Sequence, residues 1–449
     1  MWDKNFLSRL LRLGLPIMLQ NLFVVLGNSI TTLMTGKLGD IPIAAAGLSN
    51  QLFFILSLVQ FGVGSGASIF TAQFWGNRDR ESVLKALGVS LTLGAGVGAL
   101  FMVIALFFPY AFLNIFTQDP AVITIAASLL KIVGFSFLFT PVINTYAFIL
   151  RSTGSVRLPM LVSTVGVGLN ALLGYGLIFG KLGMPNLGVN GAAAANLIAR
   201  VAECLVLVWL VYRLKTPLAA PLRQLFSFDQ AFIKKVLHRV LPVMTNELIW
   251  ALGITAYAAI YARLGTEAYA AVAIKDTIEN LTFVPFIGIT NACAILVGNT
   301  IGAGKKEAAQ GFVKQSVIIS FGLGLLFGLL LGLGRHFIIS YFNIEDLTRG
   351  FAENMVLVLA AALWIRASNI LLFIGMMRSG GDTRFAIRMD AGSMWLMGVP
   401  LALLAAFVFH LPVYYVFLTV MIEEAFKFII SVWRYRSKRW IHDLVSAKP

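Results

Sequence analysis

GVSLTLGAGVGALFMVIALFF, residues 88–108, is a run of 21 residues without one charged side chain. It is longer than the roughly 18 apolar residues that indicate a membrane-crossing helix, and it is apolar on all sides, without the alternation of a barrel strand. Similar runs recur along a chain that is 59% hydrophobic and only 12% charged. The sequence therefore predicts a helical membrane protein and excludes a transmembrane barrel.

Twelve such runs are separated by short polar connections, and the first is too long for a cleavable signal peptide. We therefore expect an all-α polytopic membrane protein. The second and eighth runs are long enough to require tilted or bent helices. The predicted spans are 13–36, 43–74, 87–109, 122–149, 158–180, 188–212, 240–262, 268–300, 312–334, 350–377, 385–408 and 412–433.

The placement of basic residues predicts the orientation of the chain. The formal net charge is +15, from 35 Lys and Arg against 20 Asp and Glu. The two termini and every second connection, counted with Lys314 and Arg388 at the adjoining ends of spans, together hold 25 of the basic residues. The opposite connections hold five: Lys37, Lys181, Arg263, Arg335 and Arg349. Basic residues gather on the cytoplasmic side of membrane proteins. We expect a multi-pass protein of the cell membrane with both termini in the cytoplasm and no nucleic-acid partner.

One turn is written nearly twice, as RSTGSVR at residues 151–157 and RSGGDTR at residues 378–384. Aligning the chain with itself at an offset of 226 residues pairs GLPIMLQN (14–21) with VLPVMTNE (240–247). One added residue in the offset pairs the two turns. Each half holds six spans, and an even number of crossings gives both halves the same orientation. We expect two parallel-repeat lobes of six helices each.

The predicted domains are an N-terminal lobe (1–213), a cytoplasmic linker (214–237) and a C-terminal lobe (238–449). Two lobes joined by a long linker suit alternating access around a central site. GAGKKE at residues 302–307 lacks the glycine spacing and the Ser or Thr of a nucleotide-binding loop. Cys204 and Cys293 lie far from any metal or disulfide spacing. We therefore expect transport driven by an ion gradient, with no cofactor other than the coupling ion.

Several motifs together resemble the multidrug and toxic compound extrusion family over essentially the whole chain. They are LPIMLQN (15–21), NLGVNGAAAANLIAR (186–200), the GNRDRE and GAGKKE turns and the two duplicated turns. The resemblance implies two six-helix lobes in a V shape around a cavity. It also implies export of organic, often cationic or amphiphilic, compounds against inward flow of Na+ or H+.

The N-terminal half departs from the acids that the resemblance implies. Thr31 stands at the usual aspartate position of the first helix, and Gly174 stands where some members carry an acid. Asn170 matches a family asparagine. Asn21, Thr31 and Asn170 therefore remain as oxygen ligands for a cation, or as ordinary partners in hydrogen bonds between helices.

The acids predicted at membrane depth lie in the second half, where charged groups are costly enough to indicate function. Glu247 lies on the seventh span and has no basic residue near it in sequence. Lys275, Asp276 and Glu279 lie on the eighth, where Lys275 can reach Glu279 at i, i+4. We expect Glu247 to be the principal coupling group. The other three form an ion-binding cluster, or Lys275 and Glu279 form a pair that only locks the helix.

Aromatic residues near Glu247 add a further expectation. Trp250 and Tyr257 could line a cavity and stack on flat cations, although aromatic residues in helices more often serve packing. The favoured interpretation is an ion-coupled exporter, a monomer that contacts membrane lipid and a small-molecule substrate. A lipid-linked oligosaccharide flippase is the alternative, which would need several basic residues in its cavity. A membrane-embedded enzyme or scaffold would need a nucleophile or metal constellation.

The orientation can be tested by labelling single cysteines from each side of the membrane. Positions 78, 215, 305 and 380 should react from the cytoplasm, and positions 38, 182, 265 and 345 from outside. Labelling of both sets from one side would contradict the twelve-span topology with both ends inside.

Overall fold

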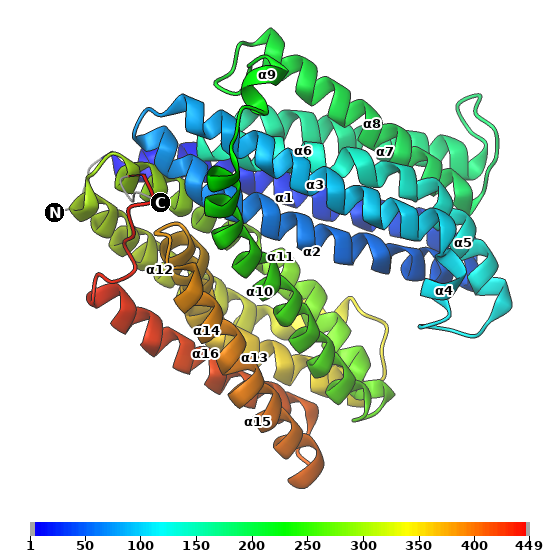
Figure 1. The fold of residues 1–449 in the computed structure, drawn as a ribbon. Helices are drawn as coiled ribbons and strands as arrows, with labels where there is room; N and C mark the ends of the chain where they lie inside the picture. The colour runs from blue at the N-terminus through cyan, green and yellow to red at the C-terminus, as the bar shows by residue number, and fades with distance from the viewer. Residues whose placement is uncertain (1–4, 446–449) are drawn as a thin grey trace. The chain divides into compact units, whose positions relative to one another are not determined.

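A computed structural model describes residues 5–445 of the protein (Figure 1). Contacts divide these residues into two compact units. The N-terminal unit holds residues 19–244, and the C-terminal unit holds residues 5–18 and 245–445. The first helix of each half therefore contributes residues to both units. These units follow contacts and not membrane crossings, so the predicted lobe boundaries stay a prediction.

The first half of the chain folds into helices joined by short turns. Asp79 and Asp119 cap the starts of two of them by accepting backbone hydrogen bonds from Ser82 (3.0 Å) and Ala121 (2.9 Å). The helices are α1 (Phe6–Gly36), α2 (Asp40–Gly76), α3 (Arg80–Phe107), α4 (Pro109–Leu113), α5 (Pro120–Gly134), the 3-10 turn η1 (Phe135–Leu138), α6 (Phe139–Ser152), α7 (Arg157–Phe179), α8 (Val189–Arg213) and α9 (Leu222–Leu225).

The second half repeats the helical pattern and contains three π-helical segments. A π-helical turn interrupts the regular ladder of hydrogen bonds, and such turns are frequent at functional sites. The elements are α10 (Gln230–Ala262), α11 (Thr266–Gly302), α12 (Lys306–Ser340), α13 (Asp346–Ile370), η2 (Leu371–Arg378), α14 (Thr383–Ser393), η3 (Met394–Gly398), α15 (Val399–Leu403), η4 (Leu404–Val408) and α16 (Val413–Arg436), of which η2, η3 and η4 are π-helical.

The predicted all-α fold of twelve membrane helices is confirmed. Within residues 5–445, eleven helical segments are long and apolar enough to cross a membrane, counting α5 to α6, α13 to η2, and α14 to η4 as single spans. The twelfth, α16, is 24 residues long but carries Glu423, Glu424 and Lys427 near its middle. Its charged residues, and not its length, set α16 apart from the other eleven.

Small residues allow α12 to approach α13 closely within the C-terminal unit. A Cβ atom on Gly324 would lie 2.5 Å from the Cα atom of Trp364, and one on Gly328 would lie 2.4 Å from the carbonyl oxygen of Ala360. Both distances are shorter than van der Waals contact. Glycine is therefore required at these two positions by packing, as is common where membrane helices meet.

Alanine substitutions on α12 test this packing. Gly324→Ala should lower the melting temperature of the purified protein, because the added methyl group collides with the α13 backbone. Gly322→Ala is the matched control, since nothing lies within 4 Å of a Cβ atom there, and it should melt like the wild type or slightly higher. Equal melting temperatures for the two variants would contradict the close approach.

Candidate functional site

Glu247 is held by an arginine that is distant in the sequence. Its Oε1 atom lies 2.6 Å from the Nη2 atom of Arg378, at the end of η2. The Glu247 side chain is 11% exposed and that of Arg378 is 3% exposed. Glu247 is therefore paired, although no basic residue is near it along the chain. Among the described residues, the Nη1 atom of Arg378 has no hydrogen-bond partner, so this guanidinium keeps one free donor.

The N-terminal unit contains a related contact without the carboxylate. Arg151, the first residue of the other duplicated turn, donates from Nη2 to the side-chain oxygen of Gln20 on α1 at 2.6 Å. At the 226-residue offset between the two halves, Gln20 aligns with Asn246, the neighbour of Glu247. Each turn arginine therefore reaches the first helix of its own half. Only the C-terminal unit places an acid there.

The RSGGDTR turn is also attached to the C-terminal end of the described chain. Asp382 accepts a hydrogen bond from Arg434 Nε at 2.7 Å and lies 3.5 Å from His442. Burial opposes ionisation of Asp382, but hydrogen bonds from His442 and Arg434 outweigh it and lower the pKa of this carboxyl. Trp440, fully buried, packs against Gly380. The turn that carries Arg378 is thus held by the segment that follows α16.

A second group of charges, the α11 cluster, consists of Lys275, Asp276 and Glu279 on α11 and Arg366 on α13. Lys275 contacts Asp276 and lies 3.1 Å from Glu279, and the Nη2 atom of Arg366 lies 2.6 Å from the Oε1 atom of Glu279. The Lys275–Glu279 contact expected from the sequence is therefore present. Two acids face two basic groups, so the α11 cluster is electrically balanced.

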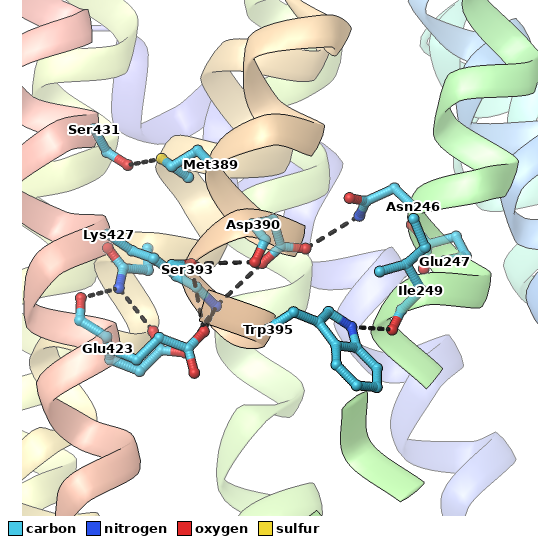
Figure 2. Close-up of polar contacts among 12 residues, drawn as sticks. Asn246, Glu247, Ile249, Met389, Asp390, Ser393, Trp395, Glu423, Lys427 and Ser431 are labelled. Atoms are coloured by element: carbon cyan, nitrogen blue, oxygen red, sulfur yellow. Dashed lines mark hydrogen bonds and ion pairs between the residues drawn. The ribbon is translucent and has the colours of Figure 1, made fainter. Parts of the chain in front are cut away.

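A third group, the α16 cluster, consists of Asp390 on α14 with Glu423, Glu424 and Lys427 on α16. Figure 2 labels Asp390, Glu423 and Lys427. The Lys427 ammonium lies 2.5 Å from Glu423, 3.1 Å from Asp390 and 3.6 Å from Glu424. Three carboxylates thus surround one cation. Their side chains are 1% (Glu423), 14% (Asp390) and 18% (Glu424) exposed.

Neutral polar side chains complete the α16 cluster. Asn246 donates to Asp390 at 3.1 Å, Asn369 donates to Glu424 at 2.7 Å, and the Tyr257 hydroxyl lies 2.7 Å from Glu423. Tyr257, which was expected to line a cavity, is thus buried, and its hydroxyl group forms a hydrogen bond with Glu423. Trp250 is 38% exposed. Their role as cavity aromatics stays a prediction.

The predicted polar residues of the first half lie in the N-terminal unit. Asn21 is half-buried on α1, and Asn170 is half-buried on α7. Thr31 donates to the carbonyl oxygen of Gly27, four residues earlier on its own helix, at 3.1 Å. Thr31 therefore satisfies its hydroxyl locally. The structure does not test whether any of the three binds a cation.

Neither the α16 cluster nor the partner of Glu247 was predicted from the sequence. A signal for the cluster existed, because Glu423 and Lys427 are spaced i, i+4 inside an apolar span, where charges indicate function. Asn246 and Asn369 carried no comparable signal. Among residues 5–445 there is no group of three or more His, Cys, Asp or Glu side chains arranged to hold a metal ion.

An apolar pocket of about 790 Å3 lies in the N-terminal unit, and none of the charged residues described above lines it. It is lined by α3, α6 and α8 together with the linker, including Tyr146, Tyr212 and Phe226. Arg80 fixes the linker at its rim by donating to the carbonyl oxygens of Pro217 and Ala219, both at 2.8 Å. The pocket offers room for an apolar molecule but no charged partner.

Comparison with known proteins agrees with the duplicated architecture. The MatE family model matches residues 16–176 and 242–404, one segment in each half. A probable multidrug resistance protein NorM of Thermotoga maritima is 25% identical over 96% of this chain and 93% of its own. The multidrug resistance protein NorM of Burkholderia vietnamiensis is 28% identical over 88% of this chain and 86% of its own.

Solved structures have the same fold. A MOP superfamily transporter from Pyrococcus furiosus superposes with a TM-score of 0.88 over 96% of this chain and 95% of its own, at 20% identity. This likeness concerns the fold alone.

The balance of the α11 cluster can be tested by Glu279→Gln. Breaking a buried ion pair costs about 3–5 kcal/mol, and thermal unfolding in detergent should show a clear loss of stability. Adding Lys275→Met should restore only part of it, because Arg366 still lacks its carboxylate. Glu267→Gln, at an exposed acid on the same helix, is the control and should change little. Complete rescue by Lys275→Met would show that the Arg366 contact contributes nothing.

Proposed function

Because the chain belongs to the MatE family of membrane transporters, we propose that it is an antiporter that exports organic compounds in exchange for H+ or Na+. The family model matches a segment in each half, and the relatives of similar length are named as multidrug resistance proteins. The expected substrates are cationic or amphiphilic, and the protein acts as a monomer in contact with membrane lipid. Alternating access would carry the substrate from the cytoplasm, where both termini lie.

The observation that carries the coupling proposal is the buried ion pair of Glu247 and Arg378. Coupling requires a carboxylate for which substrate and coupling ion compete, since each must leave when the other enters. In the C-terminal unit the Arg378 guanidinium is the cation that pairs with the Glu247 carboxylate. A proton, a sodium ion or a cationic substrate can replace this arginine only when the pair separates. Glu247 is therefore the proposed coupling group, and Asp276 or Glu279 assists it.

The same geometry gives less support to a lipid-linked oligosaccharide flippase. Such a protein needs basic groups that are free to bind a pyrophosphate. Arg200 lies 2.8 Å from Glu203, Arg366 lies 2.6 Å from Glu279, and Lys275 contacts two acids. The remaining basic candidate, Lys131, lies 5.7 Å from the ring centre of Tyr110. The basic residues within the spans are thus largely neutralised by neighbouring acids.

Glu247→Gln tests the assignment in proteoliposomes with an imposed pH or Na+ gradient. The variant keeps the size of the side chain but cannot change its charge, so gradient-driven export should fall to the level of empty liposomes. Glu353→Gln is the matched control, because Glu353 pairs with a half-exposed His336 instead, and it should export normally. Full-rate export by Glu247→Gln would contradict the assignment and return attention to Asn21, Thr31 and Asn170.

Replacing Arg378, the partner of Glu247, distinguishes two roles for this arginine. It is either a gate that pairs with the carboxylate or an anchor that sets the orientation of the chain in the membrane. Arg378→Lys keeps the positive charge but loses the planar fork that holds a carboxylate. Export should decrease at normal expression, and more so than for Arg151→Lys, whose partner Gln20 is neutral. Normal export by both variants would leave the duplicated arginines as anchors of the cytoplasmic side.

A further inference from the structure

The α16 cluster holds more negative than positive groups. Its three carboxylates face one ammonium, as described above. Ionised groups removed from water are stable only when their charges are compensated. The remaining charge therefore has to be met by a neighbouring cation, by an ion taken up from solution or by protonation.

Neighbouring helices do not supply the missing positive charge. Arg366 on α13 interacts electrostatically with Glu424, but its guanidinium is engaged with Glu279 at 2.6 Å. Lys275 on α11 contacts Asp276 and Glu279. Taken together, the α11 and α16 clusters hold five acids and three cations, which is an excess of two acids. Asp276 is 55% exposed. Without it, four acids face three cations, so an excess of one acid remains among the more buried side chains.

The neutral partners of the α16 cluster can accommodate either protonation state. The amides of Asn246 and Asn369 donate to Asp390 and Glu424, and their oxygens have no hydrogen-bond partner within the described residues. These two residues are 2% and 7% exposed. An amide that turns over offers its oxygen to a protonated carboxyl group, and a tyrosine hydroxyl can likewise donate or accept.

Space for the hydrogen bond between Tyr257 and Glu423 depends on Gly398, the last residue of η3. A Cβ atom on Gly398 would lie 2.0 Å from the Tyr257 hydroxyl and 2.1 Å from the Glu423 carboxylate. A side chain at position 398 would therefore force these two groups apart. Glycine at position 398 of η3 leaves room for the hydrogen bond between Tyr257 and Glu423.

We propose that the α16 cluster is a proton-binding site in which Asp390, Glu423 and Glu424 share at least one proton. Lys427 occupies the centre where a metal cation would have to lie, and amphiprotic side chains surround the acids, so the geometry favours a proton over Na+. Uptake converts one carboxylate to a carboxylic acid, and release returns the proton to water through the partly exposed Asp390 or Glu424. The acids titrate as a unit. This proposal rests on the proposed ion coupling and adds to Glu247 a second titrating site.

Difference infrared spectroscopy of the purified protein measures this directly, without transport. A carboxylic acid C=O band should be present near neutral pH and should disappear as the pH is raised. Glu423→Gln and Asp390→Asn each remove one excess charge, so each should lose most of the band. Glu247→Gln should keep it, because Glu247 is paired one to one with Arg378.

Replacing Lys427, the central cation of the cluster, should have the opposite effect on the carboxylic acid band. Lys427→Gln increases the excess of acids, so the band should persist to a pH about 1–3 units higher, the range that a nearby charge produces. If this variant does not fold, Glu424→Gln keeps the proposal testable, because it also removes one excess charge and should lose most of the band. Gly398→Ala should alter the band, whereas Gly392→Ala, with nothing within 4 Å of its Cβ position, should not.

Two results would overturn the proposal: a band unaffected by Glu423→Gln and Asp390→Asn, or one that Na+ removes at constant pH. Either would leave the Glu247 assignment standing, because export by Glu247→Gln is measured separately. Conversely, normal export by Glu247→Gln together with a band that depends on Glu423 would reject the first assignment and retain this one.

Discussion

The cost of removing ionised groups from water governs the C-terminal unit. Glu247 and Glu279 reach guanidinium groups from helices distant in the sequence, each at 2.6 Å. These contacts attach α10 to η2 and α11 to α13 by interactions that apolar packing could not specify. The α16 cluster is the exception, because its acids outnumber its cation. Charge balance therefore marks one group of side chains as different from the other two.

The internal duplication shows how the two halves have diverged around a shared contact. Both turn arginines bind the first helix of their own half, Arg151 through Gln20 and Arg378 through Glu247. Both also lie over a phenylalanine ring, Phe148 and Phe373 respectively. An amide partner leaves Arg151 with a net charge, whereas the carboxylate neutralises Arg378. The same architecture thus provides a fixed contact in one half and a charge-dependent one in the other.

The sequence predicted the fold better than the site, for a physical reason. Helical spans follow from local hydrophobicity, so the twelve helices could be predicted along the chain. The Lys275–Glu279 contact was also local. In contrast, the partner of Glu247 lies 131 positions away, and π-helical segments leave no simple pattern. Charges in α16 were visible, but only folding brings Asp390 and the two asparagines to them.

Two consecutive residues of α10 join two of these charge groups. Asn246 donates to Asp390 of the α16 cluster, while Glu247 binds Arg378. Successive side chains on a helix point about 100° apart, so this short stretch contacts α14 on one side and η2 on the other. Trp395 of η3 adds a hydrogen bond to the carbonyl oxygen of Ile249 at 3.2 Å. A rotation of α10 that separates Glu247 from Arg378 must also move the amide that stabilises ionised Asp390. In the proposed mechanism, protonation of the cluster and release of Glu247 are therefore linked through these two neighbouring residues.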